Sequence, residues 1–595
     1  MNISERLSSL RQMMREEHID AFIFPSTDPH NGEYIPEHWM GRQWISGFNG
    51  SAGTAVVTLH EAALWTDSRY FIAAAEQLDG TEYVLMKEAV EGTPTIAQWL
   101  AMKLSVSGGS CVGIDGMVTA ASEVETLVAD LRQAGGITIR TNLDPLRTIW
   151  KDRPEIPLAK VEIQPVEYAG EDVKSKLQRI RKEMRNSHAN GMLVTALDEI
   201  AWTLNLRGQD VHCNPVFVSY LLIREDDATL FVDERKLTAE VHVYLHGNGI
   251  KVLPYDDIKS ALKGYKDYSI LMSSVTTCHT LYDSVKAAVV DVPSPIAVMK
   301  AVKNEAEIRG FRNAMRRDGV AMVKFLRWLL PAVKTGKETE MSIDRKLTAL
   351  RAEQHLYRDI SFDTIAGYQG HGAIVHYEAT SETDAPLQPE GFLLLDSGAQ
   401  YQDATTDITR TIALGPVTEE QRRVYTFVLK GNIQLAMLKF PDGASGTQLD
   451  ALARMDMWRE GMNYLHGTGH GVGSYLNVHE GPHQIRMQWK PTPLHAGMTV
   501  TDEPGLYLEG RFGVRIENTM LITPYKETEF GKFLQMESLT LCPIDMSPIV
   551  TSMMRKEEIE WLNGYHQRVR EELLPLLEDE ADRSWLIENT EALVV

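Results

Sequence analysis

Four histidines lie within the twenty residues 464–483, YLHGTGHGVGSYLNVHEGPH. They are His466, His470, His479 and His483. Histidines four residues apart can bind zinc from one face of a helix, but each glycine of GTGHGVG would destabilise that helix by about 1 kcal/mol relative to alanine. We therefore expect a glycine-rich loop or strand edge that a substrate backbone can approach closely, or a turn whose histidines have no chemical role.

Acidic residues interrupt an apolar strand pattern upstream of these histidines, in FLLLDSGAQYQDATTDITRTIAL, residues 392–414. The pattern predicts a hairpin with Asp396 on one arm and Asp407 on the other. Because Asp396 follows a run of Phe and Leu, we expect it to be buried, and a buried carboxylate must be paired, protonated or bound to a metal. The alternative is that Asp396 only caps the turn at Ser397.

A similar pattern follows in MTVTDEPGLYLEGRFGVRIENTMLI, residues 498–522. Glu503 comes after an apolar strand, and Glu517 shares one face with Arg515 in a strand expected across VRIENTM. Burying these charges without a role would be costly, and we expect Arg515 to pair with a carboxylate.

The candidate ligands therefore form a set rich in oxygen, with one imidazole nitrogen. Four negative charges would neutralise two divalent cations. Such a set favours a hard cation over a thiolate-type zinc site, so Mn²⁺ is the predicted metal, although Co²⁺ and Zn²⁺ would also bind. The candidates are Asp396, Asp407, His470, Glu503 and Glu517.

These residues and their surrounding motifs resemble the "pita-bread" metallopeptidases of peptidase family M24, and specifically the three-domain X-Pro aminopeptidases. The motifs are LLDSGAQY, DITRT, HGTGHGVG, TDEPG and RIEN. The resemblance covers nearly the whole chain and includes STDPHNGEYIPEHWMGRQWISGFNGSAG near the N-terminus, KNEAEIRG and EWLNGYH.

The resemblance implies a role for each candidate. Asp396 would bind a first metal, His470 and Glu503 a second, and Asp407 and Glu517 would bridge both. Glu503 would also shuttle a proton. The resemblance also implies that three histidines face the substrate. They are His376, His466 and His479, whereas His483 is expected to have no role in the site.

The implied reaction is hydrolysis of the bond between an N-terminal residue X and a proline at position 2, by a hydroxide held between two metals. A homodimer is also implied. Three alternatives are a prolidase specific for X-Pro dipeptides, a non-catalytic peptide-binding protein, and a metal-free amidinohydrolase resembling creatinase. The complete ligand set argues against the last two, and the long N-terminal region argues against a prolidase.

The first 300 residues contain one pattern twice. An apolar strand, AFIF at 21–24 or MLV at 192–194, leads to a tryptophan segment and then to a strand that ends in an acid and an arginine. The offset of 166 between Asp67 and Asp233 is too long for a solenoid repeat and indicates two copies of one α/β domain. The predicted fold class is therefore α/β, with two creatinase-like domains before a pita-bread domain.

Boundaries are expected in the Pro-rich and charged segment 151–172 and near 294–310. The predicted domains span residues 1–157, 158–300 and 301–595. A long helix with an apolar face is expected to open the third domain and to end at Pro331. A second amphipathic helix, expected to pack back on that domain, carries Leu562, Tyr565, Val569 and Leu573.

Composition excludes several classes of partner. Sixty basic residues against 82 acidic residues give a net charge of −22, so neither nucleic acid nor an anionic membrane is an expected partner. The apolar runs are too short to span a membrane, and the segment after Met1 lacks the apolar core of a secretory signal, so we expect a cytoplasmic protein. No CxxC pair occurs, and reduced, buried thiols are expected at Cys111, Cys213, Cys278 and Cys542.

Overall fold

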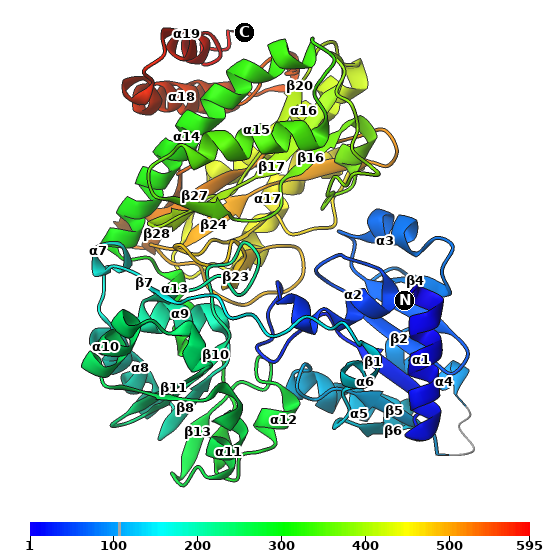
Figure 1. Cartoon of the computed structure of the whole chain (residues 1–595). Helices are drawn as coiled ribbons and strands as arrows, with labels where there is room; N and C mark the ends of the chain where they lie inside the picture. Colours follow the sequence, from blue (N-terminus) through cyan, green and yellow to red (C-terminus); the bar gives the residue numbers. More distant parts are fainter. Residues whose placement is uncertain (105–108, 595) are drawn as a thin grey trace. The chain divides into compact units, whose positions relative to one another are not determined.

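The computed structural model describes residues 1–104 and 109–594, which form two compact units (Figure 1). The N-terminal unit comprises Met1–Gln164 and Glu171–Ile296, and the C-terminal unit comprises Pro165–Gly170 and Ala297–Val595. Each unit mixes helices and strands, which confirms the predicted α/β class. The domain boundaries at 157/158 and 300/301 stay predictions.

Two six-stranded sheets of the same topology make up the N-terminal unit. Their strand orders are β4-β3-β2-β1-β5-β6 and β12-β11-β10-β8-β13-β14. The first sheet contains β1 (Ala21–Phe24), β2 (Thr54–Thr58), β3 (Ala62–Thr66), β4 (Tyr83–Lys87), β5 (Cys111–Ile114) and β6 (Thr138–Arg140). The second contains β8 (Gly191–Val194), β10 (Ser219–Arg224), β11 (Ala228–Val232), β12 (Ile250–Leu253), β13 (Ser269–Leu271) and β14 (Ala288–Val290).

The parallel and antiparallel pairings of the two sheets also correspond, strand for strand. β1 and β8 each pair antiparallel with the next long strand and parallel with the strand on the other side. The acid-plus-arginine motif recurs at the same place, because Arg69 binds Asp67 at 2.8 Å after β3 and Arg235 binds Asp233 at 2.7 Å after β11. The predicted duplication is therefore confirmed.

Helices cover these sheets. The first of them, α1 (Ile3–Glu16), is capped by Asn2 and buries Leu7, Leu10 and Met14, the spacing expected of an amphipathic helix. The others are α2 (Gly41–Ser46), α3 (Phe71–Leu78), α4 (Ile96–Lys103), α5 (Ala121–Gly135), α6 (Leu146–Ile149), α8 (Val173–Asn186), α9 (Leu197–Leu204), α10 (Ala239–Gly247), α11 (Ile258–Lys263) and α12 (His279–Tyr282).

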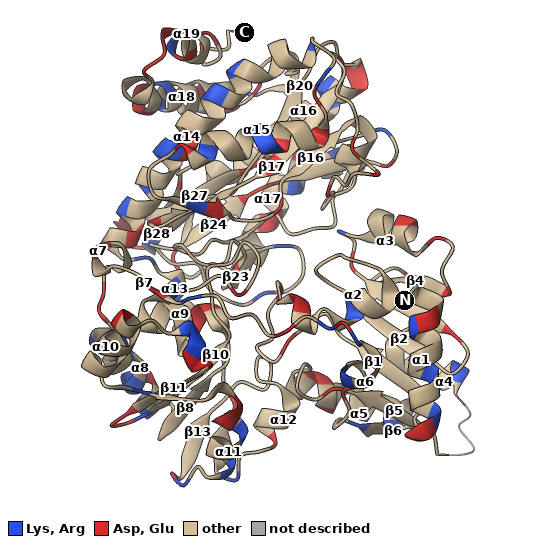
Figure 2. Cartoon of the chain, viewed as in Figure 1, with Lys and Arg blue, Asp and Glu red and all other residues tan. Residues whose placement is uncertain are grey.

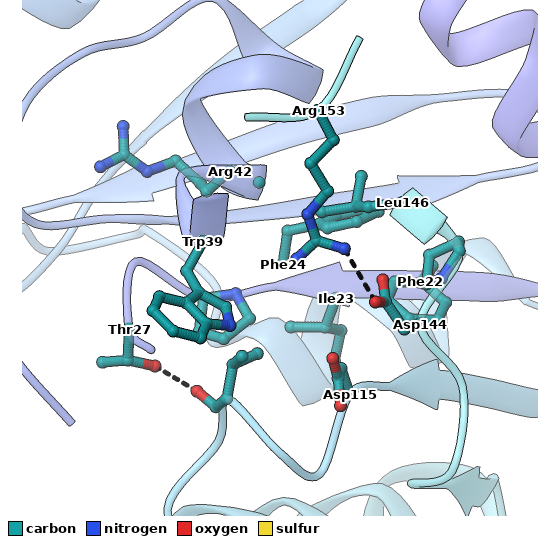
Figure 3. A pocket seen from close by; sticks show the side chains of 14 residues that line it. Phe22, Ile23, Phe24, Thr27, Trp39, Arg42, Asp115, Asp144, Leu146 and Arg153 are labelled. Carbon is teal, nitrogen blue, oxygen red and sulfur yellow. Dashed lines mark hydrogen bonds and ion pairs between the residues drawn. The ribbon is translucent and has the colours of Figure 1, made fainter. Parts of the chain in front are cut away.

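A small hollow lies where β1 and β5 end, in the first sheet of the N-terminal unit (Figure 3). Arg153 on its wall pairs with Asp144 at 2.8 Å, and Arg42 donates to the Phe48 carbonyl at 2.5 Å. Burial raises the pKa of Asp115, also on the wall, to about 7. Both guanidinium groups are therefore bound by the protein itself, Arg42 within the segment that follows β1 and Arg153 within the segment that follows β6.

The C-terminal unit carries the candidate ligands on short strands between helices. Its strands are β15 (Tyr357–Ile360), β16 (Ile365–Tyr368), β17 (Phe392–Ser397), β18 (Ala399–Tyr401), β19 (Ala404–Thr405), β20 (Ile408–Ala413), β21 (Lys439–Pro441), β22 (Gly469–Gly471), β23 (Glu480–Ile485), β24 (Thr499–Asp502), β25 (Gly505–Leu508), β26 (Phe512–Arg515), β27 (Asn518–Thr528) and β28 (Gly531–Ser538). Its long helices are α14 (Glu305–Val333), α15 (Glu340–Ala352), α16 (Glu419–Ala436), α17 (Gly446–Arg459), α18 (Lys556–Leu573) and α19 (Glu580–Glu588).

The helix α14 opens this unit as predicted, but its predicted end is wrong. Asn304 caps its first turn by accepting from the backbone N–H of Glu307, whose side chain accepts from the Asn304 N–H in return. Pro331 lies inside the helix, which continues to Val333. A proline removes one backbone donor, and this loss is tolerated so near the helix end because Val333 is buried in the core.

Two apolar cores lie on opposite faces of the β16-β17-β20 sheet. Leu393 and Leu395 point toward α14 and α15, whereas Phe392 packs with residues of α16 and α18. The predicted C-terminal helix is α18, and its four apolar residues are all buried in this second core, as predicted.

The acidic residues of α14 are Glu305, Glu307 and Asp318, and its other charged residues are basic (Figure 2). Within residues 1–104 and 109–594, no helix has both the length and the apolar character that a bilayer crossing requires. The four cysteines, all within the described residues, form no disulfide, and three of them are buried while Cys111 is half-buried, close to the prediction.

A buried histidine of α18 makes the stability of the protein depend on pH. His566 Nε2 accepts a hydrogen bond from the backbone N–H of Ile544 at 3.0 Å, so this nitrogen carries no proton. Burial, reinforced by Arg410 and Arg570, lowers the pKa of His566 from 6.5 to about 3. Between these values the unfolded chain binds a proton at His566 that the folded chain does not, so stability falls as pH falls.

We therefore expect His566→Gln to make the free energy of unfolding less dependent on pH. The glutamine oxygen can accept from Ile544 but does not titrate. The loss of stability between about pH 6.5 and about pH 4.5 should become smaller, by up to about 1.4 kcal/mol per pH unit. Denaturant unfolding of both proteins across this range measures the difference, and equal pH slopes would contradict the assignment.

Candidate metal centre

The hairpin predicted to carry Asp396 and Asp407 is present. β17 pairs antiparallel with β20, with Asp396 opposite Thr409, and Asp407 directly precedes β20. The short strands β18 and β19 pair with each other and form the turn. Asp396 and Asp407 are 7% and 4% exposed, so both carboxylates are buried, and the prediction for Asp396 is confirmed.

Glu503 and Glu517 lie where strands end. Glu503 stands between β24 and β25, and Glu517 stands between β26 and β27. The prediction of one continuous strand across VRIENTM is wrong, because β26 pairs with β25 whereas β27 pairs with β24 and β28. The chain changes sheets at Ile516 and Glu517, and this change directs the Glu517 side chain to the cluster.

Glycines let the strand that carries His470 approach its neighbour. His470 lies in β22, which pairs antiparallel with β23, so the predicted strand edge is confirmed. A Cβ atom at Gly469 would lie 1.8 Å from the Thr501 carbonyl oxygen, and one at Gly471 would lie 2.6 Å from the Glu480 carbonyl oxygen. Only glycine therefore fits on either side of His470.

The structure brings the five candidate ligands into one cluster. His470 Nε2 lies 3.4 Å from Asp407 Oδ2 and 3.4 Å from Glu503 Oε1. Asp407, His470 and Glu517 each offer a ligand atom within 4.8 Å of the other two. Asp396 belongs to the same cluster, because it interacts electrostatically with Asp407, Glu503 and Glu517, and Arg515 interacts with both Asp396 and Glu503.

Hydrogen bonding orients the His470 ring toward the acids. Its Nδ1 lies 2.8 Å from the Gly471 carbonyl oxygen, which can only accept, so Nδ1 carries the proton and Nε2 faces the carboxylates. Burial alone would lower the pKa of His470, but the hydrogen bond to Asp407 and the charges of Glu503 and Asp407 raise it to about 9. The cluster thus attracts positive charge strongly.

The surroundings of the carboxylates disfavour their ionised form. Burial, reinforced by neighbouring acids, raises the pKa of Asp396, raises that of Glu503 to about 7 and raises that of Glu517 well above its ordinary range. Asp396 Oδ1 is buried and accepts no hydrogen bond from the described residues. An oxygen-rich set of this kind, with an unused oxygen and one imidazole nitrogen, fits divalent cations.

Neighbouring hydroxyl groups hold the ligands in place. Thr409 Oγ1 donates to Glu517 Oε2 at 2.7 Å, and Thr501 Oγ1 donates to Glu503 Oε1 at 3.0 Å. The sequence reasoning missed both threonines. Each lies two residues from a ligand, on the same face of its strand, so the period-2 pattern was a signal that could have found them.

Arg515 pairs with a carboxylate, as predicted. Its Nη2 lies 2.7 Å from Asp396 Oδ2, and its Nη1 donates to the Tyr507 hydroxyl at 2.8 Å. Tyr507 in turn donates to His466 Nε2 at 2.8 Å, because His466 Nδ1 is bound to the Gly467 carbonyl oxygen. This chain of hydrogen bonds links His466 to Asp396 through Tyr507, which the sequence reasoning also missed.

The remaining histidines occupy different environments. The His479 ring packs against the His470 ring, with centroids 4.4 Å apart. His376 directly follows Val375, whose carbonyl oxygen accepts from Arg515 Nη2 at 3.3 Å. His483 is fully buried, binds the Thr499 carbonyl at 2.7 Å and has its pKa lowered to about 4 by burial, so it supports the fold.

Comparison with known proteins places this cluster in a family. The description "Metallopeptidase family M24" matches residues 309–524, and "C-terminal region of peptidase_M24" matches residues 532–593. Residues 6–149 and 152–307 each match a "Creatinase/Prolidase N-terminal domain". With these matches and relatives of 40% identity over its full length, the chain belongs to metallopeptidase family M24.

The similar proteins are named as peptidases specific for proline. Proteins called "Probable Xaa-Pro aminopeptidase P" from Aspergillus niger and Penicillium rubens are 40% identical, with 100% of this chain and 99% of each relative covered. An X-prolyl aminopeptidase from Caenorhabditis elegans, described as a cytosolic enzyme with a di-nuclear active site, is 33% identical, with a TM-score of 0.95 and 100% of both chains covered. A prolidase from Pyrococcus horikoshii is 26% identical, with a TM-score of 0.50, and covers 62% of this chain and 99% of its own.

We expect Glu517→Gln to stabilise the metal-free protein and to weaken its response to metal. The amide keeps the hydrogen bond from Thr409 but removes one negative charge from a buried cluster of like charges. The denaturant midpoint without metal should rise, and the further increase caused by Mn²⁺ should shrink. A metal-free variant less stable than the wild-type protein would show that repulsion in the cluster is not the dominant effect.

Proposed function

We propose that this chain is a metal-dependent aminopeptidase that hydrolyses the bond between an N-terminal residue and a proline at position 2 of a peptide. The single observation that carries the proposal is the convergence of three buried carboxylates, the half-buried carboxylate of Glu503 and one imidazole, which come from separate strands and strand ends. The names of the full-length relatives support the same reaction.

The five residues of the cluster are the proposed ligands of two divalent cations. Asp396 would hold the first cation, His470 and Glu503 would hold the second, and Asp407 and Glu517 would contribute to both. The 3.4 Å approach of His470 Nε2 to both Asp407 and Glu503 supports a shared centre. Bound cations of this kind lower the pKa of a water molecule and polarise a carbonyl group.

Residues of the chain then move the proton. Glu503 Oε1 takes the proton of the attacking water and returns it to the departing proline nitrogen. An amide nitrogen leaves as an amine only when it gains a proton, so the proline nitrogen needs this proton to depart. The hydrogen bond from Thr501 supports this role, since it fixes the position of the carboxylate.

The three histidines bind the substrate. His479 or His376 donates a hydrogen bond to the scissile carbonyl and the proline side, and such an N–H group stabilises charge on the carbonyl oxygen. His466 lines the proline pocket. Its ring is held in place by Tyr464 and Tyr507, whose ring centroids lie 4.9 Å and 5.4 Å away.

An aminopeptidase is favoured over a prolidase by the extent of the structural match. The prolidase from Pyrococcus horikoshii leaves more than a third of this chain unmatched, whereas the X-prolyl aminopeptidase from Caenorhabditis elegans matches the whole chain. The prolidase reaction remains the second candidate, because it uses the same ligands.

Further parts of the proposal rest on the resemblance and on composition. Mn²⁺ is the proposed metal, a homodimer the proposed assembly and the cytoplasm the proposed location. The three proposed domains span 1–157, 158–300 and 301–595. Nucleic acid and membranes are not proposed as partners.

We expect Asp407→Ala to abolish hydrolysis and metal binding together, because a bridging carboxylate serves both cations. The activity on an X-Pro peptide should fall at least about a thousandfold. Metal content of the purified variant, measured beside its rate, tests the role. A variant with full Mn²⁺-dependent turnover would rule out the bridging assignment.

His479→Ala is the matched control, since it removes a neighbouring imidazole that is not a proposed ligand. We expect it to retain both metals and to lose rate, with a larger fall in kcat than rise in KM. Loss of metal from this variant would move His479 into the ligand set.

We expect the wild-type protein to cleave Arg-Pro-Pro faster than the dipeptide Gly-Pro, by about tenfold or more in kcat/KM. An aminopeptidase gains binding energy from residues beyond proline, whereas a prolidase excludes them. Release of the N-terminal residue from each peptide at equal metal loading measures the ratio. Preference for Gly-Pro would favour the prolidase.

A further inference from the structure

Arg410 is a buried cation whose hydrogen bonds to the described residues all go to uncharged oxygen atoms. It is 2% exposed and lies in β20, three residues after Asp407. Its six acceptors are the carbonyl oxygens of Thr409, Glu517, Cys542 and Pro543, the Asn518 side-chain oxygen and the Tyr565 hydroxyl. Burying a guanidinium group costs free energy, which indicates that its hydrogen bonds have a structural role.

One side of Arg410 holds the backbone that carries Glu517. Nη1 donates to the Glu517 carbonyl at 2.7 Å and to the Thr409 carbonyl at 2.9 Å. The Glu517 N–H donates to the same Thr409 oxygen at 3.0 Å, and Thr409 Oγ1 binds the Glu517 carboxylate. Thr409 and Arg410 together therefore hold the N–H, the carbonyl and the carboxylate of Glu517.

The other side of Arg410 reaches the C-terminal helix α18. Nη2 donates to the Tyr565 hydroxyl at 3.0 Å and to the Cys542 carbonyl at 2.9 Å. The Tyr565 hydroxyl also lies 3.0 Å from the Thr540 carbonyl oxygen and 3.3 Å from the Cys542 N–H, while its ring stacks on Trp561. Tyr565 is thus a fixed anchor, buried and 5% exposed.

We propose that Tyr565 is a positioning residue of the metal centre, acting through Arg410 on Glu517. The helix α18 then has a second role besides packing on the core. The Tyr565 hydroxyl orients the Arg410 guanidinium, and that guanidinium holds Glu517, a proposed bridging ligand. Residues that orient metal ligands in this way commonly change metal affinity by about ten- to a hundredfold when they are removed. The inference rests on the proposed metal centre and deepens it.

The test compares Tyr565→Phe with Tyr425→Phe. Both changes remove one buried hydroxyl from the same core, but the Tyr425 hydroxyl donates to the Asp545 carbonyl at 2.7 Å and is not one of the six hydrogen-bond acceptors of Arg410. Mn²⁺ titration of each metal-free, full-length protein gives the dissociation constants, and denaturant unfolding gives the loss of stability.

We expect Tyr565→Phe to weaken Mn²⁺ binding by about tenfold and Tyr425→Phe by less than about twofold, with similar losses of stability. Equal Mn²⁺ affinity in the two variants would overturn the inference. Should Tyr565→Phe not fold, Arg410→Lys serves instead: weaker Mn²⁺ binding supports the inference, and wild-type affinity contradicts it.

The outcome can be separated from that of the proposed function. If the wild-type protein binds no Mn²⁺ and cleaves no X-Pro peptide, the proposed function fails. If the wild-type protein does both and Tyr565→Phe binds Mn²⁺ as tightly as Tyr425→Phe, only the role of Tyr565 fails.

Discussion

Carboxylates buried close together repel one another unless positive charge lies among them, and this constraint governs the C-terminal unit. Asp396 pairs with Arg515, and Asp407 and Glu503 both lie close to His470. These two acids raise the pKa of His470 to about 9, although burial acts to lower it. Arg515 and His470 supply too little positive charge to neutralise the four carboxylates. Divalent cations would supply the rest.

The acids are held in place because the backbones of several strands approach one another closely. Gly469 permits contact with the Thr501 carbonyl, and Thr501 in turn holds Glu503. The change of sheets between β26 and β27 directs Glu517 toward the cluster. Arg410 holds this segment by donating a hydrogen bond to the Glu517 carbonyl. The helices on both faces of the sheet exclude water, which makes each of these contacts stronger and each unpaired charge more costly.

Local patterns in the sequence predicted the acids of the cluster, because acids that interrupt apolar strands are visible one strand at a time. The same reasoning predicted both N-terminal sheets from a repeated motif. It could not find Tyr507, Arg410 or Tyr565, whose partners lie far along the chain and carry no local signal. It misplaced the end of α14, because burial of Val333 outweighed the preference of proline, and it read β26 and β27 as one strand because alternation does not reveal a change of sheets.

The central claim is that this nest of acids binds two cations side by side. The most direct measurement is anomalous X-ray scattering from a crystal of the full chain grown with Mn²⁺. The account predicts two anomalous peaks about 3.5 Å apart, bounded by Asp396, Asp407, His470, Glu503 and Glu517. Diffraction data with the five side chains ordered and no peak among them, or a single peak held by other residues, would contradict it.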